Sequence, residues 1–121
     1  MGYYLHITRA GDSWADSADH PISTEEWTAF AAAHPSIVAD PDNGPLDHVF
    51  TCHDGTEACL TWKNGQIEVR GTHADDKDLA RLAAQIEARL LGDDDEEYDL
   101  NGQPIEWEAP RPPITPNRLK I

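Results

Sequence analysis

The chain of 121 residues carries 23 Asp and Glu but only 9 Lys and Arg, so its formal net charge at pH 7 is −14. Because nucleic acids and anionic membrane surfaces are bound through clustered Lys and Arg side chains, this balance argues against both as direct partners. The length favours one domain. No apolar run approaches the roughly 20 residues that cross a bilayer. Two cysteines without a signal peptide indicate a reducing, cytoplasmic location.

The beginning of the chain predicts a strand followed by a polar loop. Residues 3–8 alternate between apolar and polar side chains, as a half-buried strand does. Residues 9–21 form a polar loop that contains Trp14, which no periodic pattern explains. We expect this tryptophan to fold back as a lid over the core.

A helix is predicted over residues 24–33. Ser23 and Glu26 have the spacing of a capping box, in which each side chain accepts a hydrogen bond from a free backbone N–H. Ile22 and Trp27 stand where a hydrophobic staple would hold the first turn. The proline that follows the helix prevents its continuation.

The middle of the chain predicts a short strand at residues 36–39 and a three-stranded meander at residues 47–71. The dipeptides Asp54-Gly55 and Asn64-Gly65 are strong signals for hairpin turns. In the second hairpin, a two-residue turn places Trp62 opposite Ile67 and Leu60 opposite Val69, which creates one apolar face.

The register of the first hairpin has two alternatives. A two-residue turn would place Phe50 opposite Cys59 on the polar face, whereas a three-residue turn over residues 54–56 with a bulge opposes Phe50 to Leu60. We favour the bulged register because it restores a single apolar face. In this register Cys52 and Cys59 point to opposite faces and cannot form a disulfide.

Residues 75–91 carry the clearest helical periodicity in the chain. Asp75 is the expected N-cap, and Gly92 is the expected residue just beyond the end. The apolar stripe of this helix consists of Leu79, Leu82, Ala83, Ile86 and Leu90.

These elements predict an α+β fold with one antiparallel sheet of about four to five strands and two helices packed on one face. A further small hairpin at residues 97–107 is possible. Residues 1–108 would form a single α+β domain. Residues 109–121, which hold four prolines, would form an extended C-terminal tail.

An acidic run is the main candidate for a functional surface. Residues 93–108 contain eight carboxylates and no Lys or Arg. Such a run is often only a solvated surface, but crowded carboxylates can also attract a basic protein, and flanking aromatic residues can anchor it. The predicted partner-binding residues are Asp93, Asp94, Asp95, Glu96, Glu97, Tyr98, Asp99 and Trp107.

The sequence gives little support for a metal site or an active site. A calcium loop that starts at Asp93 fails because Tyr98 occupies the position that requires glycine. The six histidines form no HExxH motif, and a zinc cluster of His48 with Cys52 lacks the paired ligand spacing of zinc motifs. No GxSxG motif or glycine-rich phosphate loop is present. We therefore expect no catalytic residue, metal or cofactor.

Two segments carry a resemblance to known proteins. The chain opens with YYLHITRAGDSWADSADHPISTEEWTAF and later continues with LLGDDDEEYD. These segments resemble small bacterial proteins that begin with a strand ending in HITR, an acidic Trp-containing loop, an HPIS-type cap and an EEW helix. Such chains are similar to the immunity proteins of bacterial polymorphic toxin systems. The resemblance implies a cytosolic protein that binds and neutralises a cognate toxin, and it assigns no catalytic residues.

The leading hypothesis is therefore a toxin-neutralising immunity protein that occludes a basic cognate toxin through its acidic surface. The first alternative is a non-catalytic accessory or structural binding module. The second alternative is a small metal-dependent enzyme built on the histidines, which a deep pocket holding His48 or His53 would favour.

Overall fold

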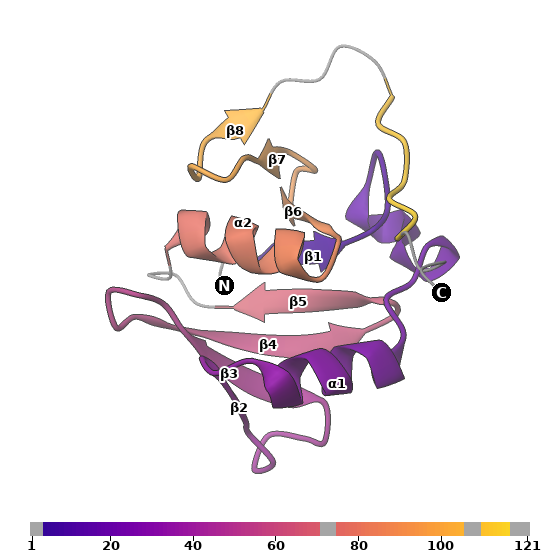
Figure 1. Cartoon of the computed structure of the whole chain (residues 1–121). Coiled ribbons are helices and arrows are strands. Elements are labelled where there is room, and N and C mark those ends of the chain that lie inside the picture. Colours follow the sequence, from indigo (N-terminus) through magenta and orange to yellow (C-terminus); the bar gives the residue numbers. More distant parts are fainter. Residues whose placement is uncertain (1–3, 71–74, 106–109, 117–121) are drawn as a thin grey trace.

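The computed structural model of this chain describes residues 4–70, 75–105 and 110–116. They form one antiparallel sheet with two α-helices on one face, so the predicted α+β class is confirmed (Figure 1). The predicted number of strands is wrong, because the sheet has eight. The elements are β1 (Leu5–Thr8), η1 (Trp14–Asp19), α1 (Thr24–Ala33), β2 (Ile37–Ala39), β3 (Asp47–Thr51), β4 (Glu57–Lys63), β5 (Gln66–Arg70), α2 (Asp76–Gln85), β6 (Arg89–Gly92), β7 (Glu97–Tyr98) and β8 (Pro104–Ile105).

The strands follow the order β2-β3-β4-β5-β1-β6-β7-β8, and every neighbouring pair is antiparallel. The first strand of the chain thus lies in the middle of the sheet, where Ile7 pairs with Ile67 on one side and with Leu90 on the other. Neither α-helix among the described residues has the length and apolar composition needed to cross a bilayer.

The first helix has the predicted bounds and the predicted cap. The Ser23 hydroxyl accepts a hydrogen bond from the Glu26 N–H at 3.0 Å, and the helix ends at Ala33. Trp27 is 1% exposed and packs in the core, as its helical position predicts. The Trp62 indole N–H donates to the Ile22 carbonyl at 2.7 Å, which ties the entry of α1 to the sheet.

The meander confirms one predicted register and corrects the other. The second hairpin pairs Trp62 with Ile67 as expected. The bulged register of the first hairpin is wrong, because Phe50 faces Ala58 and His48 faces Leu60. A longer loop closes this hairpin, with the Cys52 N–H donating to the Thr56 carbonyl at 2.7 Å. Because the observed register differs by two residues from the predicted one, the apolar face is the same.

The two cysteines lie on opposite faces of the meander, as expected. Cys52 is buried, Cys59 is exposed, and both are free thiols.

The second helix is shorter than the predicted range of residues 75–91. Asp75 caps it as predicted, but the helix ends at Gln85. Glu87 then adopts a positive φ of 58°, and the Ala88 N–H donates to the Ala83 carbonyl at 2.9 Å. This is a Schellman motif, which turns the chain into β6. The helical prediction fails here because a strand covered on both faces has a continuous apolar run that resembles a buried helix.

The two faces of the sheet differ in chemistry. One face carries apolar side chains that pack against both α-helices, and this layer is the hydrophobic core. The centre of the other face carries buried polar side chains, among them His6, Thr8 and Gln66. The segment around η1 covers them: the Trp14 ring stacks on the His6 ring at a centroid distance of 4.1 Å. Trp14 thus folds back onto the sheet as expected, but it covers the polar face and not the hydrophobic core.

Three buried arginines fasten the outer segments to the sheet. Arg9 donates to the Ile86 carbonyl at 2.7 Å and forms an ion pair with Glu26. Arg89 donates to the Ala10 carbonyl at 2.6 Å. Because a guanidinium offers five N–H donors, one side chain can satisfy several carbonyls of irregular segments.

Residues 110–116 have no regular secondary structure and lie against the first loop. Arg111 donates to the Asp12 carbonyl at 2.9 Å and to the Asp95 carbonyl at 2.6 Å. The contact is close, because a Cβ on Gly11 would lie 2.0 Å from the Arg111 carbonyl oxygen. This part of the expected tail is therefore extended but packed against the domain.

Candidate functional site

The carboxylates of the acidic run mostly make contacts within the protein. Asp93 accepts hydrogen bonds from the Tyr4 N–H at 2.9 Å and from His6 Nε2 at 2.8 Å. Asp95 accepts one from the Trp14 N–H at 2.9 Å. These two side chains therefore hold neighbouring segments in place, and their charge is only partly available to a partner.

The later part of the run is also used internally. Glu97 lies 3.5 Å from Arg89 and 3.6 Å from Arg111, which are ion-pair contacts longer than hydrogen bonds. Asp99 caps the β7–β8 turn by accepting two backbone N–H groups, each at 2.9 Å. The Tyr98 hydroxyl donates to the Glu96 carboxylate at 3.0 Å. Trp107, the remaining predicted anchor, lies outside the described residues.

A wider acidic surface forms where the run meets the η1 segment. Asp94 is exposed, as are Asp12 and Asp16 from the first loop. The bonds of Arg111 to Asp12 and to the Asp95 carbonyl join the two segments. We call this surface the acidic end; it consists of Asp12, Asp16, Asp93, Asp94, Asp95 and Glu96. Sequence reasoning missed its first two members because they lie far from the run along the chain.

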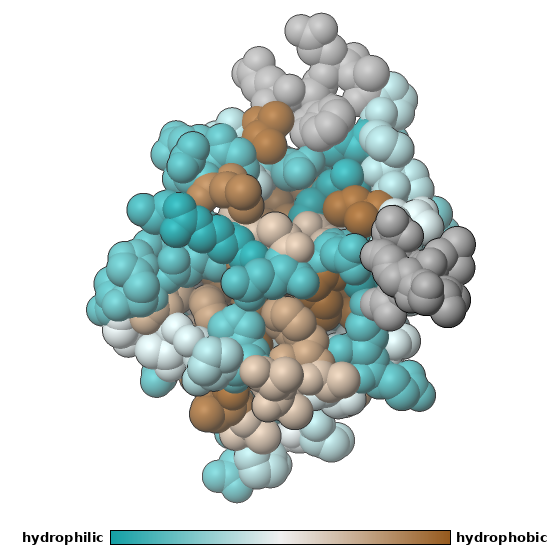
Figure 2. Space-filling view, in the orientation of Figure 1, coloured by the Kyte–Doolittle hydropathy of each residue, from teal (hydrophilic) through white to brown (hydrophobic). Residues whose placement is uncertain are grey.

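Among the described residues, only two large hydrophobic side chains are exposed, those of Val38 and Leu100. Figure 2 shows polar residues around one face and apolar areas in its centre, with a light brown area over α1, whose exposed residues include several alanines. Of the seven Lys and Arg residues in the part of the chain that the structure describes, Arg9, Arg89 and Arg111 are buried. Burial lowers the pKa of Arg9 and that of Arg89 from the ordinary value. The surface is thus more acidic than the composition alone implies.

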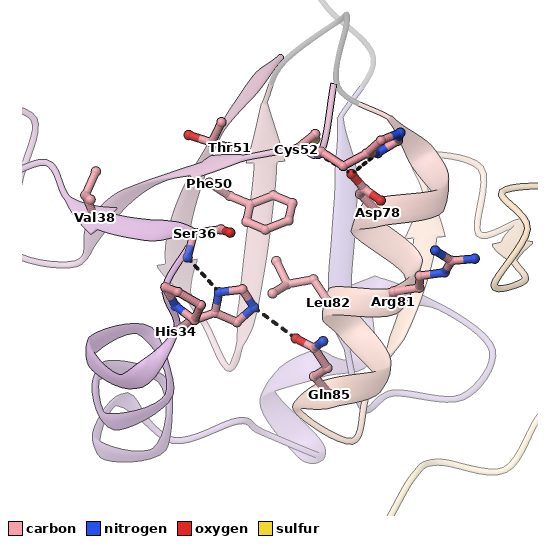
Figure 3. Close-up of a pocket in the computed structure, with 12 residues that line it drawn as sticks. His34, Ser36, Val38, Phe50, Thr51, Cys52, Asp78, Arg81, Leu82 and Gln85 are labelled. Atoms are coloured by element: carbon pink, nitrogen blue, oxygen red, sulfur yellow. Dashed lines mark hydrogen bonds and ion pairs between the residues drawn. The ribbon is translucent and has the colours of Figure 1, made fainter. Parts of the chain in front are cut away.

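A second candidate site is a cavity of about 440 Å³ between β2, β3 and α2 (Figure 3). Phe50 and Leu82 form its apolar floor. On one wall, His34 Nδ1 accepts from the Ser36 N–H at 3.1 Å, so its Nε2–H can donate to Gln85 at 3.0 Å. Both hydrogen bonds hold the His34 ring at the wall of the cavity.

His53 and Asp78 line the opposite end of the cavity, and Asp75 lies beside them in one cluster. The His53 N–H donates to Asp78 Oδ2 at 2.7 Å, and His53 Nδ1 lies 2.7 Å from the same oxygen. His53 Nδ1 also lies 3.6 Å from Asp75 Oδ2. The hydrogen bond with Asp78 raises the pKa of His53. Burial alone would raise the pKa of Asp78, but the hydrogen bonds from His53 hold that pKa below its ordinary value.

Sequence reasoning named His53 as a histidine that a pocket could hold, but did not place any carboxylate beside it. The hairpin loop carries His53, whereas the two aspartates lie at the start of α2, so only the fold brings them together.

Comparisons with known proteins add no assignment. No family model, curated protein or solved structure matches the chain. The resemblance to immunity-type proteins therefore stays a prediction.

Proposed function

We propose that this chain is a non-catalytic binding protein of the immunity type, which occludes a basic surface of a cognate protein toxin. The observation that carries the proposal is the separation of charge: three arginines are buried, while carboxylates from two distant segments are exposed at the acidic end. A surface of this kind attracts a cationic partner.

The acidic end is also held rigidly, which supports a role in binding. Trp14 stacks on His6 and donates its backbone N–H to Asp95, and Arg111 joins the first loop to the run. A binding surface that is ordered before it meets its partner loses less conformational entropy on association. The fixed carboxylates therefore favour both fast encounter and stable docking.

The partner in this proposal is a cytosolic toxin domain with clustered Lys and Arg, such as one that itself binds a nucleic acid or a nucleotide. Tyr98 is half-buried beside the acidic end and would supply apolar contact, together with the predicted anchor Trp107. Neutralisation would follow from steric occlusion, so no catalytic group is required.

The test uses the product of the neighbouring gene as the partner. The triple variant Asp12→Asn, Asp16→Asn and Asp94→Asn removes three exposed charges from the acidic end. The affinity for the toxin at low salt should fall about tenfold or more, and its dependence on salt should weaken. Asp93 and Asp95 stay unchanged because they support the fold, and asparagine at position 12 keeps an oxygen that can accept the Arg111 N–H.

A matched control removes the same charge elsewhere. The variant Glu25→Gln, Asp42→Asn and Glu57→Gln changes three other exposed carboxylates. Its affinity should stay within about threefold of the wild-type value. Equal affinities for the acidic-end variant and the wild type would contradict the proposed contact surface, and a neighbouring product that does not bind the intact chain would contradict the proposed function.

A further inference from the structure

We propose that His53, Asp75 and Asp78 form a binding site for a first-row divalent metal ion such as Zn²⁺, at the mouth of the cavity between β3 and α2. The three potential ligand atoms, one imidazole nitrogen and two carboxylate oxygens, lie within 4.8 Å of one another. Zinc binds these atom types in proteins at about 2.0–2.2 Å, so ligand atoms of one site lie about 3–4 Å apart. The site is independent of the acidic end.

Two chain segments hold the cluster in place. Asp75 uses its Oδ1 to cap α2 by accepting the Lys77 N–H at 2.9 Å, which leaves its Oδ2 toward His53. The His53 backbone N–H donates to Asp78 and fixes the hairpin loop against the first turn of the helix. The ligand atoms are therefore gathered before any ion arrives, which lowers the ordering cost of binding.

An ion can reach this position. The side-chain exposures are 63% for His53, 25% for Asp75 and 13% for Asp78, so the cluster opens to solvent on the side of the imidazole. Bound metal would replace the proton that His53 and Asp78 now share. The negative charge of the two aspartates, together with that of nearby Asp54, favours a cation here.

The cavity that adjoins the cluster supplies a second observation. His53 and Asp78 line the cavity of about 440 Å³, whose floor is Phe50 and Leu82. Three protein ligands leave at least one coordination position of the ion open, as in catalytic zinc sites. The open coordination position of a metal held here would face this pocket, which has an apolar floor and Arg81 at its edge. Such a pocket suits a small ligand with a carboxylate group.

The experiment titrates the untagged full-length chain with Zn²⁺ against a chromophoric chelator and follows backbone amide signals by NMR. We expect one Zn²⁺ per chain, with the largest signal changes at residues 53–56 and 75–79. His53→Gln should weaken binding about tenfold or more. Asp78→Asn should also weaken it, although asparagine keeps an oxygen that can accept the His53 N–H.

Two further histidine variants serve as controls. His20→Gln changes an exposed histidine after η1, and His34→Gln changes the opposite wall of the same cavity. Both should bind Zn²⁺ within about twofold of the wild-type affinity. Amide spectra of all variants confirm that they fold. The proposal is overturned if the wild type binds no Zn²⁺, if His53→Gln binds as tightly as the wild type, or if the signal changes centre on another histidine.

Discussion

In the turn after α2, a glutamate occupies a backbone conformation that usually requires glycine. Glu87 has a φ of 58°, in the left-handed region where glycine is the usual residue at the end of a helix. The Schellman hydrogen bonds from Glu87 and Ala88 hold this conformation, and the Arg9 guanidinium donates to the Glu87 carbonyl at 3.1 Å. These contacts use backbone groups, so they do not depend on the glutamate side chain.

Replacing Glu87 should therefore separate backbone strain from side-chain charge. Glu87→Gly should have a free energy of unfolding about 1 kcal/mol higher than Glu87→Ala, because both remove the carboxylate but only glycine relieves the left-handed strain. Urea denaturation followed by circular dichroism measures the difference. An alanine variant as stable as the glycine variant would show that the turn is not strained at this residue.

The elements that sequence patterns locate best are those with local signals. The Ser23 cap and the second hairpin turn each depend on residues within a few positions, and both are confirmed. Strand β6 was missed because Leu90 and Leu91 are both buried, so the segment lacks the alternation of a half-buried strand.

For the candidate sites, too, sequence patterns located only what local signals determine. The sequence located the acidic run, but not which of its carboxylates turn inward, because Asp93 and Asp95 are engaged by residues from the first strand and first loop. The cluster at His53 likewise joins a loop and a helix start. Both arrangements depend on long-range contacts, which no local pattern contains.

We expect the Arg111 side chain to hold residues 110–116 against the first loop. Its guanidinium donates to two carbonyls and lies 3.6 Å from Glu97. Arg111→Met keeps most of the side-chain length but removes the donor to these partly buried carbonyls, so the free energy of unfolding should fall by about 1–3 kcal/mol. Hydrogen exchange of the Ile114 N–H, which donates to the Arg9 carbonyl at 2.8 Å, should accelerate.

Arg70→Met is the matched control for this change. Arg70 is exposed, and its bond to the Thr61 hydroxyl is 3.3 Å long, so its loss should change stability by no more than about 0.5 kcal/mol. If Arg111→Met left both stability and Ile114 protection unchanged, contacts other than the guanidinium would hold the segment.

For the molecule as a whole, the net charge of −14 should make stability depend on ionic strength. Repulsion between carboxylates destabilises the compact state, and salt screens it. Raising NaCl from about 20 to 200 mM should increase Tm by roughly 2–5 °C, measured by thermal denaturation in chelator-containing buffer. KF at matched ionic strength should act equally. A constant or falling Tm would mean that internal ion pairs outweigh the repulsion.

The central place of β1 has a consequence for how the chain reaches its native state. Through His6 this strand pairs with Glu68 on one side and Leu91 on the other, so neither neighbour exists until most of the polypeptide has been synthesised. High contact order of this kind slows folding. Until β6 has been synthesised, β1 has an unpaired edge that other nascent chains can bind. Pairing with β6 covers this edge and so protects the chain against aggregation during biosynthesis.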